Sequence, residues 1–152
     1  VDTPLNIYNH PANQFVAGFI GSPPMNFFKG KIVRKGAALW FEEGRFGVAL
    51  AGPAADKLAA FAGQSVAMGI RPENVDERAA KPNANPAHVV KATVEVVEMM
   101  GSEVYLYATT GQTNFTARVG PSCRKQIGDS VEVVLDMDKV HFFGGPEEKA
   151  LL

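Results

Sequence analysis

The sequence predicts a mainly β fold: a small, closed or nearly closed β-barrel with two short N-terminal helices and one short internal helix. Three observations support this fold class. Apolar and polar residues alternate along several short segments, as in strands that bury one face. Glycines separate these segments, as between tightly connected antiparallel strands. Several short strands with one solvated face suit a small barrel, which is a common scaffold for binding.

Residues 1–21 carry a helical pattern, unlike the rest of the chain. Pro4 indicates the start of a first short helix, because proline presets φ at the first helical position, where its missing N–H costs nothing. A second helix is expected after Pro11, since Phe15 and Phe19 are at i and i+4 and stack on one face. This apolar face predicts that the helices pack against a further structure.

Short strands are expected from residue 25 to residue 70. They cover residues 27–34, 38–42, 46–50 and 65–70. Residues 53–61 are the exception, because this segment opens with proline, is rich in Ala and ends before Gly63, which predicts a short helix over one end of the sheet. Residues 75–86 are polar and contain Pro82 and Pro86, so they are expected to form an exposed loop.

The last third of the chain has the clearest alternation. Residues 90–96, 114–119 and 131–137 each alternate apolar with polar side chains, which predicts strands with one buried face. Residues 104–108, after a glycine-bearing turn, and residues 140–143 supply two more strands.

Composition narrows the classes of function. A chain of 152 residues is long enough for a domain with a core but too short for a complete ATPase. Lys and Arg total 15 against 16 Asp and Glu, so no net positive field attracts nucleic acid, which is not expected as a partner. No apolar run approaches the roughly 20 residues that span a bilayer, so any link to a membrane is expected through a partner.

The sequence lacks the phosphate-binding loop of ATPases. That loop needs Gly-x-x-x-x-Gly-Lys followed by Ser or Thr, so that backbone N–H groups hold phosphate and the hydroxyl binds magnesium. Gly30-Lys31 is the single Gly-Lys pair, but Met25 stands where the first glycine is needed and Ile32 where the hydroxyl is needed. No ATP site is expected by this route.

Metal and nucleophile chemistry find no support in the residue spacing. The three histidines, His10, His88 and His141, are far apart and have no second His or Cys at metal-ligand spacing, so structural or surface roles are expected. Cys123 is the single cysteine, which excludes an internal disulfide and agrees with a reducing compartment. No catalytic residue, cofactor site or metal site is predicted.

Two pairs of adjacent glutamates have a simple interpretation. Side chains of Glu42 and Glu43, if they lie on a strand, point to opposite faces, and the same holds for Glu147 and Glu148. We expect both pairs to be solvated surface.

The segment Gly69-Ile70-Arg71-Pro72-Glu73 has two interpretations. Arg71 and Glu73 would lie on the same side of an extended chain, because Pro72 fixes φ between them. They could form a structural ion pair that closes the turn, or a preformed charged site at the end of a strand.

Several segments together resemble one family. In chain order they are PLNIYNHPANQFVAGFIGSPPMNF at 4–27, GIRPE at 69–73, VVE and GSE at 96–98 and 101–103, and VHFF at 140–143. The first resembles the junction after the nucleotide-binding domain in ATPase subunits of carbohydrate importers of the maltose type. The others recur in that family's order, and the resemblance covers nearly the whole chain.

The resemblance implies a domain organisation. Residues 1–21 would be the C-terminal helices of a nucleotide-binding domain whose phosphate loop, signature motif and catalytic carboxylate lie upstream. Residues 22–152 would be the regulatory domain, built of OB-like and TOBE-type β-barrel elements. ATP and magnesium would then belong to the parent chain, an ATP-hydrolysing translocase subunit, with no cofactor and no ATP site in residues 1–152.

The resemblance also implies partners and a location. The regulatory domain pairs with its copy in a second subunit and in some members receives inhibitory proteins. The parent chain would be cytoplasmic, peripheral to the inner membrane through permease subunits, and would serve import of a sugar, polyol or related solute. The family often has His where this chain has Asn74, and Arg where it has Gln14, so this protein would lack a regulator that needs those residues or use another.

The candidate interface or regulatory residues are Arg71, Glu73, Glu103, His141, Phe142 and Phe143. Phe142 and Phe143 are adjacent on the last expected strand and must point to opposite faces. One of them is expected to enter the core. The other is expected near the surface, as an anchor for a two-fold contact.

Two other functions compete with this one. TOBE-type barrels resemble molybdate-binding modules, so the alternative function is binding of a small oxyanion. Its ligands would be Ser102, Thr113 and backbone amides near Gly101. Single-strand nucleic-acid binding needs a basic groove with interleaved aromatics, which the sequence does not concentrate. Phe27, Phe28 and Trp40 are expected to fill the core instead.

The missing phosphate loop gives a first prediction. The 152-residue chain is expected neither to bind ATP with useful affinity nor to hydrolyse it. A coupled phosphate-release assay on the pure chain checks this, and saturable, magnesium-dependent turnover would contradict it.

Overall fold

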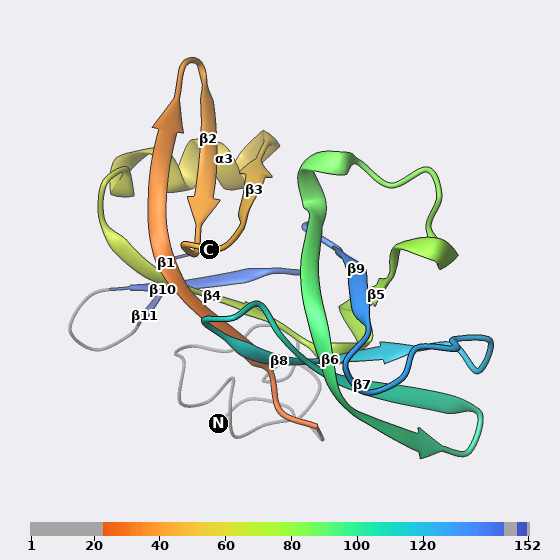
Figure 1. Ribbon diagram of the computed structural model, residues 1–152. Helices are drawn as coiled ribbons and strands as arrows, with labels where there is room; N and C mark the ends of the chain where they lie inside the picture. Colours follow the sequence, from red (N-terminus) through yellow and green to blue (C-terminus); the bar gives the residue numbers. More distant parts are fainter. Residues whose placement is uncertain (1–22, 145–148, 152) are drawn as a thin grey trace, which may run out of the picture.

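The computed structural model describes residues 23–144 and 149–151, which form two antiparallel sheets (Figure 1). The first has the order β11-β10-β4-β1-β2-β3 and the second the order β5-β9-β6-β7-β8. The strands are β1 (Asn26–Lys35), β2 (Ala38–Glu42), β3 (Gly47–Leu50), β4 (Ser65–Ile70), β5 (Val75–Glu77), β6 (Val89–Met100), β7 (Glu103–Thr109), β8 (Asn114–Val119), β9 (Ser130–Leu135), β10 (His141–Gly144) and β11 (Lys149–Ala150). The mainly β fold class is confirmed.

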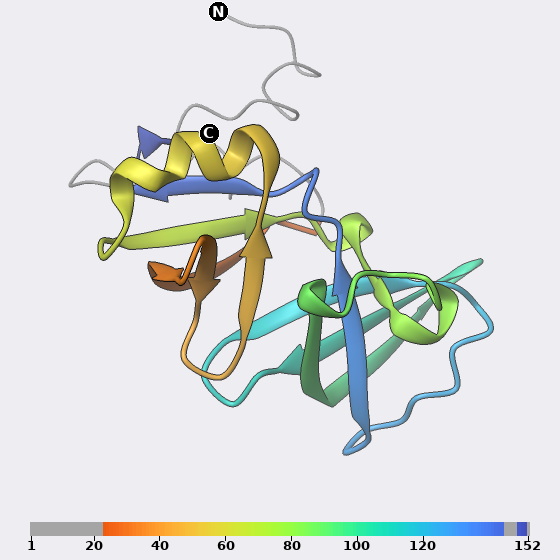
Figure 2. The same ribbon diagram turned by 90° about the horizontal axis from the view of Figure 1, so that it is seen from above.

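Helical structure is short throughout the described residues. It comprises α3 (Gly52–Leu58) and the 3-10 turns η1 (Ala59–Phe61), η2 (Pro72–Asn74), η3 (Arg78–Ala80) and η4 (Pro86–His88). α3 lies beside the first sheet (Figure 2) and buries Leu58 in the core. None of these helices is long and apolar enough to cross a membrane.

The chain builds the first sheet, crosses to the second and then returns. β1 to β4 precede the second sheet, which β5 to β9 form, and β10 then pairs antiparallel with β4. Residues 69 and 141, far apart in sequence, become direct partners in this pair. The return also carries the β9–β10 connection across the junction between the sheets.

A continuous apolar core lies between the two sheets. Phe28 on β1 contacts Phe115 on β8, with ring centroids 5.5 Å apart. Phe41 on β2 contacts Phe142 on β10 at 5.9 Å, and all four rings are buried. The alternation seen in the sequence therefore identifies the inward faces of these strands.

Asn26 joins the two sheets through its side-chain amide. Its Nδ2 donates to the backbone oxygen of Thr116 at 2.8 Å, and its Oδ1 accepts from the Thr116 N–H at 2.8 Å. Asn26 stands on β1 and Thr116 on β8, so the amide acts as one rung of strand pairing between sheets that share no ladder. Asn26 is 7% exposed and Thr116 is half-buried, so these two hydrogen bonds are largely shielded from water.

Glu43 forms a second link between the sheets, and the expectation that it is solvated was wrong. It is 4% exposed. Its carboxylate accepts from the Thr110 hydroxyl at 2.7 Å and from the Arg45 N–H at 3.1 Å. Its backbone oxygen accepts from Gln112 Nε2 at 2.6 Å. Glu43 is buried because the turn after β7 folds over the end of β2.

Two aromatic residues that were expected to fill the core, Trp40 and Phe27, lie outside the core between the sheets. Trp40 lies half-buried on β2, with the Lys35 ammonium 4.9 Å from its ring centroid, while Lys35 also pairs with Glu42. Phe27 is half-buried and packs on the opposite face of β1 from Phe28. Only Phe28 of the three enters the core between the sheets.

Most of the remaining expected elements are confirmed. The bounds of β2, β4 and β8 agree with the predicted strands, and the 53–61 helix corresponds to α3 and η1. The exposed loop predicted for 75–86 was wrong at its start, because Val75 pairs with Leu135 and residues 75–77 form β5. The two N-terminal helices and Glu147-Glu148 lie outside the described residues.

The Asn26 link predicts a large loss of stability for Asn26→Leu. The substitution removes two hydrogen bonds and leaves the N–H and C=O of the half-buried Thr116 without their partner. We expect the free energy of unfolding to fall by about 2–4 kcal/mol, measured by urea denaturation. Asn114→Leu, at an exposed position on the same β8 strand, is the control, and equal losses for the two variants would contradict this role.

Candidate functional site: a pocket between the two sheets

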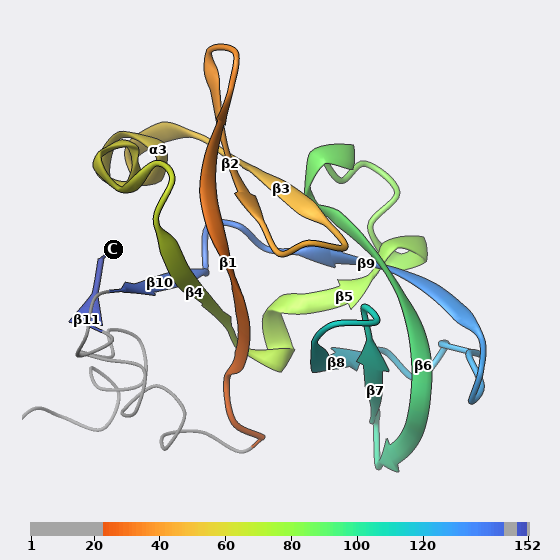
Figure 3. The ribbon, with the colours of Figure 1, turned by 60° about the vertical axis from the view of Figure 1, so that its left-hand side comes forward.

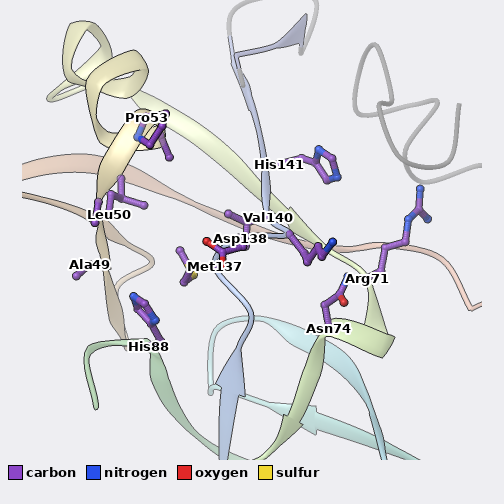
Figure 4. Close-up of a pocket in the computed structure, with 13 residues that line it drawn as sticks. Ala49, Leu50, Pro53, Arg71, Asn74, His88, Met137, Asp138, Val140 and His141 are labelled. Carbon is purple, nitrogen blue, oxygen red and sulfur yellow. The ribbon is translucent and has the colours of Figure 1, made fainter. Parts of the chain in front are cut away.

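A pocket of about 650 Å³ opens where the two sheets meet (Figure 4). Three segments that adjoin strands of the first sheet form part of its lining: the β3–α3 junction, the β4–η2 junction and the start of β10. η4 and the β9–β10 connection complete it. Its lining residues are Ala49, Leu50, Ala51, Pro53, Ala54, Arg71, Asn74, His88, Met137, Asp138, Lys139, Val140 and His141.

Arg71 is buried at this pocket, with 3% of its surface exposed. It directly follows β4, and the Asn74 N–H donates to its backbone oxygen at 2.9 Å to close the η2 turn. The backbone oxygen of Asn74 in turn accepts a hydrogen bond from the Asp136 N–H at 3.0 Å, which ties this turn to the end of β9.

The extended chain expected around Pro72 was wrong. Proline at the first position of a 3-10 turn costs no hydrogen bond, and Pro72–Asn74 turns instead of extending. As a result Arg71 is buried whereas Glu73 is exposed at the rim of an adjoining pocket.

The fold brings His88 and His141 to the same pocket although 53 positions separate them in sequence. Figure 4 shows His141 and Arg71 on one side of the β9–β10 connection, and His88 with Ala49 on the other. Across the described residues, no three His, Cys, Asp or Glu side chains gather closely enough to hold a metal ion. Sequence reasoning did not single out Lys139 and Asp138, which look like ordinary turn residues and reach the pocket only through the return of β10.

Glu103 does not belong to this site. It begins β7, beside the tip of the β6–β7 hairpin, and its carboxylate lies 3.7 Å from Nε of Arg118. The hairpin points away from β10 (Figures 1 and 3).

Phe142 and Phe143 are both buried, at 0% and 1% exposure, so the expected surface anchor was wrong. They do point to opposite faces of β10, but each face is covered. Phe142 enters the core between the sheets, and Phe143 packs in a second small cluster with Met25, Ala67 and Phe27. The rings of Phe27 and Phe143 meet edge to face at 6.0 Å.

The oxyanion site expected from Ser102 and Thr113 does not assemble within one chain. Ser102 lies in the turn before β7 and Thr113 in the turn after it. A strand of 7 residues separates the two turns by about 20 Å at roughly 3.3 Å per residue.

Cys123 has no sign of activation. Burial raises the pKa of its thiol above the ordinary value, and the nearby Glu77 carboxylate acts in the same direction. A thiol with a raised pKa is protonated near neutral pH and is a poor nucleophile.

Two family models match adjacent parts of the chain. The model of the MalK OB fold domain matches residues 21–75, and that of the TOBE domain matches residues 68–143. The chain belongs to the TOBE domain family. The boundary between the two matches falls on the β4–η2 junction, so Arg71 and Asn74 lie where the OB and TOBE parts overlap.

Three relatives of this TOBE chain are named as ATP-binding proteins of uptake or import systems. It is 39% identical to the osmoprotective compounds uptake ATP-binding protein GgtA of Synechocystis, over 99% of this chain and 41% of the relative. It is 37% identical to the oligosaccharides import ATP-binding protein MsmX of Bacillus subtilis, over 97% and 40%. It is 36% identical to the trehalose/maltose import ATP-binding protein MalK of Thermococcus litoralis, over 99% and 41%. The chain thus spans about two fifths of the length of these relatives.

Among solved structures, the TOBE chain is similar to the cytoplasmic molybdate-binding protein ModG with molybdate bound. The TM-score is 0.59 at 18% identity, covering 77% of this chain and 94% of ModG. At 18% sequence identity, the similarity between the two structures shows a shared fold and nothing further.

Burial of Phe143 predicts that Phe143→Asp destabilises the fold. A carboxylate would have to lie among Met25, Ala67 and Phe27, so we expect the free energy of unfolding to fall by more than about 3 kcal/mol. Thermal denaturation followed by circular dichroism measures this. Met99→Asp, at a side chain that is 67% exposed, is the control and is expected to change stability by less than about 0.5 kcal/mol. A fully stable Phe143→Asp variant would contradict the packing.

Proposed function

We propose that this chain is the regulatory and dimerisation part of the ATP-binding subunit of an importer for a sugar, polyol or related solute. The observation that carries the proposal is the match over 97–99% of the chain to the ATP-binding proteins of importers for oligosaccharides, trehalose/maltose and osmoprotective compounds. The matched segment covers only 40–41% of each relative, in agreement with a separate functional part.

In this proposal the chemistry of ATP belongs to the rest of the protein. Residues 1–21 belong to the C-terminal end of the nucleotide-binding domain, and residues 22–152 form the regulatory domain. ATP and magnesium bind upstream, permease subunits hold the protein at the cytoplasmic side of the inner membrane, and a regulatory protein can act on this domain.

We place the two-fold contact at the turn η2, beside the pocket, and along β10. Glu73 is exposed there and His141 is half-buried. β10 lies next to the edge of the first sheet, where β11, a strand of two residues, pairs with it. Phe142 and Phe143 support this surface from within, as buried residues that hold β10 against β4.

The test is self-association of the chain, measured by sedimentation velocity over a range of concentrations. We expect a monomer–dimer equilibrium that Glu73→Lys weakens by about tenfold, because a two-fold contact presents the changed charge twice. Glu95→Lys, at an exposed position on β6, is the matched control and is expected to leave the equilibrium unchanged. A chain that stays monomeric at every concentration, or variants that behave alike, would contradict this contact.

A further inference from the structure

The pocket between the sheets concentrates positive charge in a chain whose net charge is −1. Arg71 and Lys139 line it against a single carboxylate, that of Asp138, and two imidazoles and the Asn74 amide add hydrogen-bonding groups. Within the described residues the ammonium of Lys139 takes part in no ion pair. A guanidinium carries five N–H donors, so Arg71 can donate hydrogen bonds to another group of this chain and to a ligand at the same time.

The charges are separated within the pocket. Figure 4 shows Arg71 and His141 on one side of the β9–β10 connection, and the Asp138 carboxylate on the other side, toward Ala49 and Leu50. A simple inorganic anion would use only the first side. A carboxylate repels an anion, but it accepts hydrogen bonds from hydroxyl groups.

The far wall is apolar and built from small side chains. Ala49, Leu50, Pro53 and Ala54 form it, together with the thioether of Met137. Small ligands are commonly held in this way, by an apolar wall with a few polar groups that set orientation. The cavity of about 650 Å³ has room for more than a tetrahedral anion.

We propose that this pocket binds a small hydroxylated organic phosphate. Its phosphate group lies among Arg71, Lys139 and His141, and its carbon skeleton crosses the β9–β10 connection to reach Leu50 and Pro53, with hydroxyls toward Asp138. A ligand in this site contacts the OB and TOBE parts together, because the lining residues come from both. The inference concerns the chain itself and does not depend on the importer assignment.

The test is a titration of the 152-residue chain with glucose 6-phosphate, followed by backbone amide NMR shifts. We expect saturable shifts at residues 74 and 138–141, weaker binding of inorganic phosphate, and no binding of glucose at the same concentrations. Lys139→Gln is expected to raise the Kd for glucose 6-phosphate about tenfold, because it removes one charge-assisted hydrogen bond. Lys91→Gln, at an exposed position on β6 outside the pocket, is the matched control.

Three results would overturn the proposal. Shifts confined to other surfaces would show that the pocket is not the site. Equal Kd values for the wild-type and Lys139→Gln chains would show that its cation does not recognise phosphate. Inorganic phosphate that binds as tightly as glucose 6-phosphate would show that the wall from Ala49 to Pro53 recognises nothing organic.

Discussion

The fold depends on the junction between its two sheets, where the Asn26 amide replaces a rung of strand pairing. The sheets share no hydrogen-bonded ladder, so their relative position follows from the packing of Phe28 against Phe115 and from polar links. Apolar contact alone tolerates sliding, whereas a two-point hydrogen bond between Asn26 and the Thr116 backbone admits one register. The buried carboxylate of Glu43 fixes a second point, at Thr110 in the turn between β7 and β8.

The return of β10 to β4 makes the pocket a consequence of topology. After β9 the chain must cross from the second sheet to the first, and residues 136–140 do so beside η2. This crossing brings Lys139 into the lining of the same pocket as Arg71 and the β3–α3 junction. A basic site at a junction of this kind needs no local motif, because each of its segments is already held by strand pairing or by the short turn η2.

Local sequence patterns were sufficient for the strands and insufficient for the site. Alternation predicted the observed bounds of β8, and the spacing of glycines between short segments predicted those of β2 and β4, although β4 is buried on both faces. The partners of Asn26 and Glu43 could not be predicted, since 90 and 67 positions separate them from Thr116 and Thr110. For Phe143 the alternation was right but the assumption of a single core was wrong, because a second cluster covers the outer face of β10.

The pocket and the outer surface share two elements, the turn η2 and the strand β10. Arg71 and Asn74 belong to the turn that ties β4 to the end of β9, so a displacement of the second sheet would move Asp138 and Lys139, in the connection after β9, relative to the segments of the first sheet that line the pocket. A ligand that contacts both sides favours the arrangement in which they are close, by as much as its affinities for the two arrangements differ. The same displacement would shift β10 and the rim at Glu73, where we place the contact with a second copy. Ligand binding and pairing would therefore influence each other to the same extent in free energy.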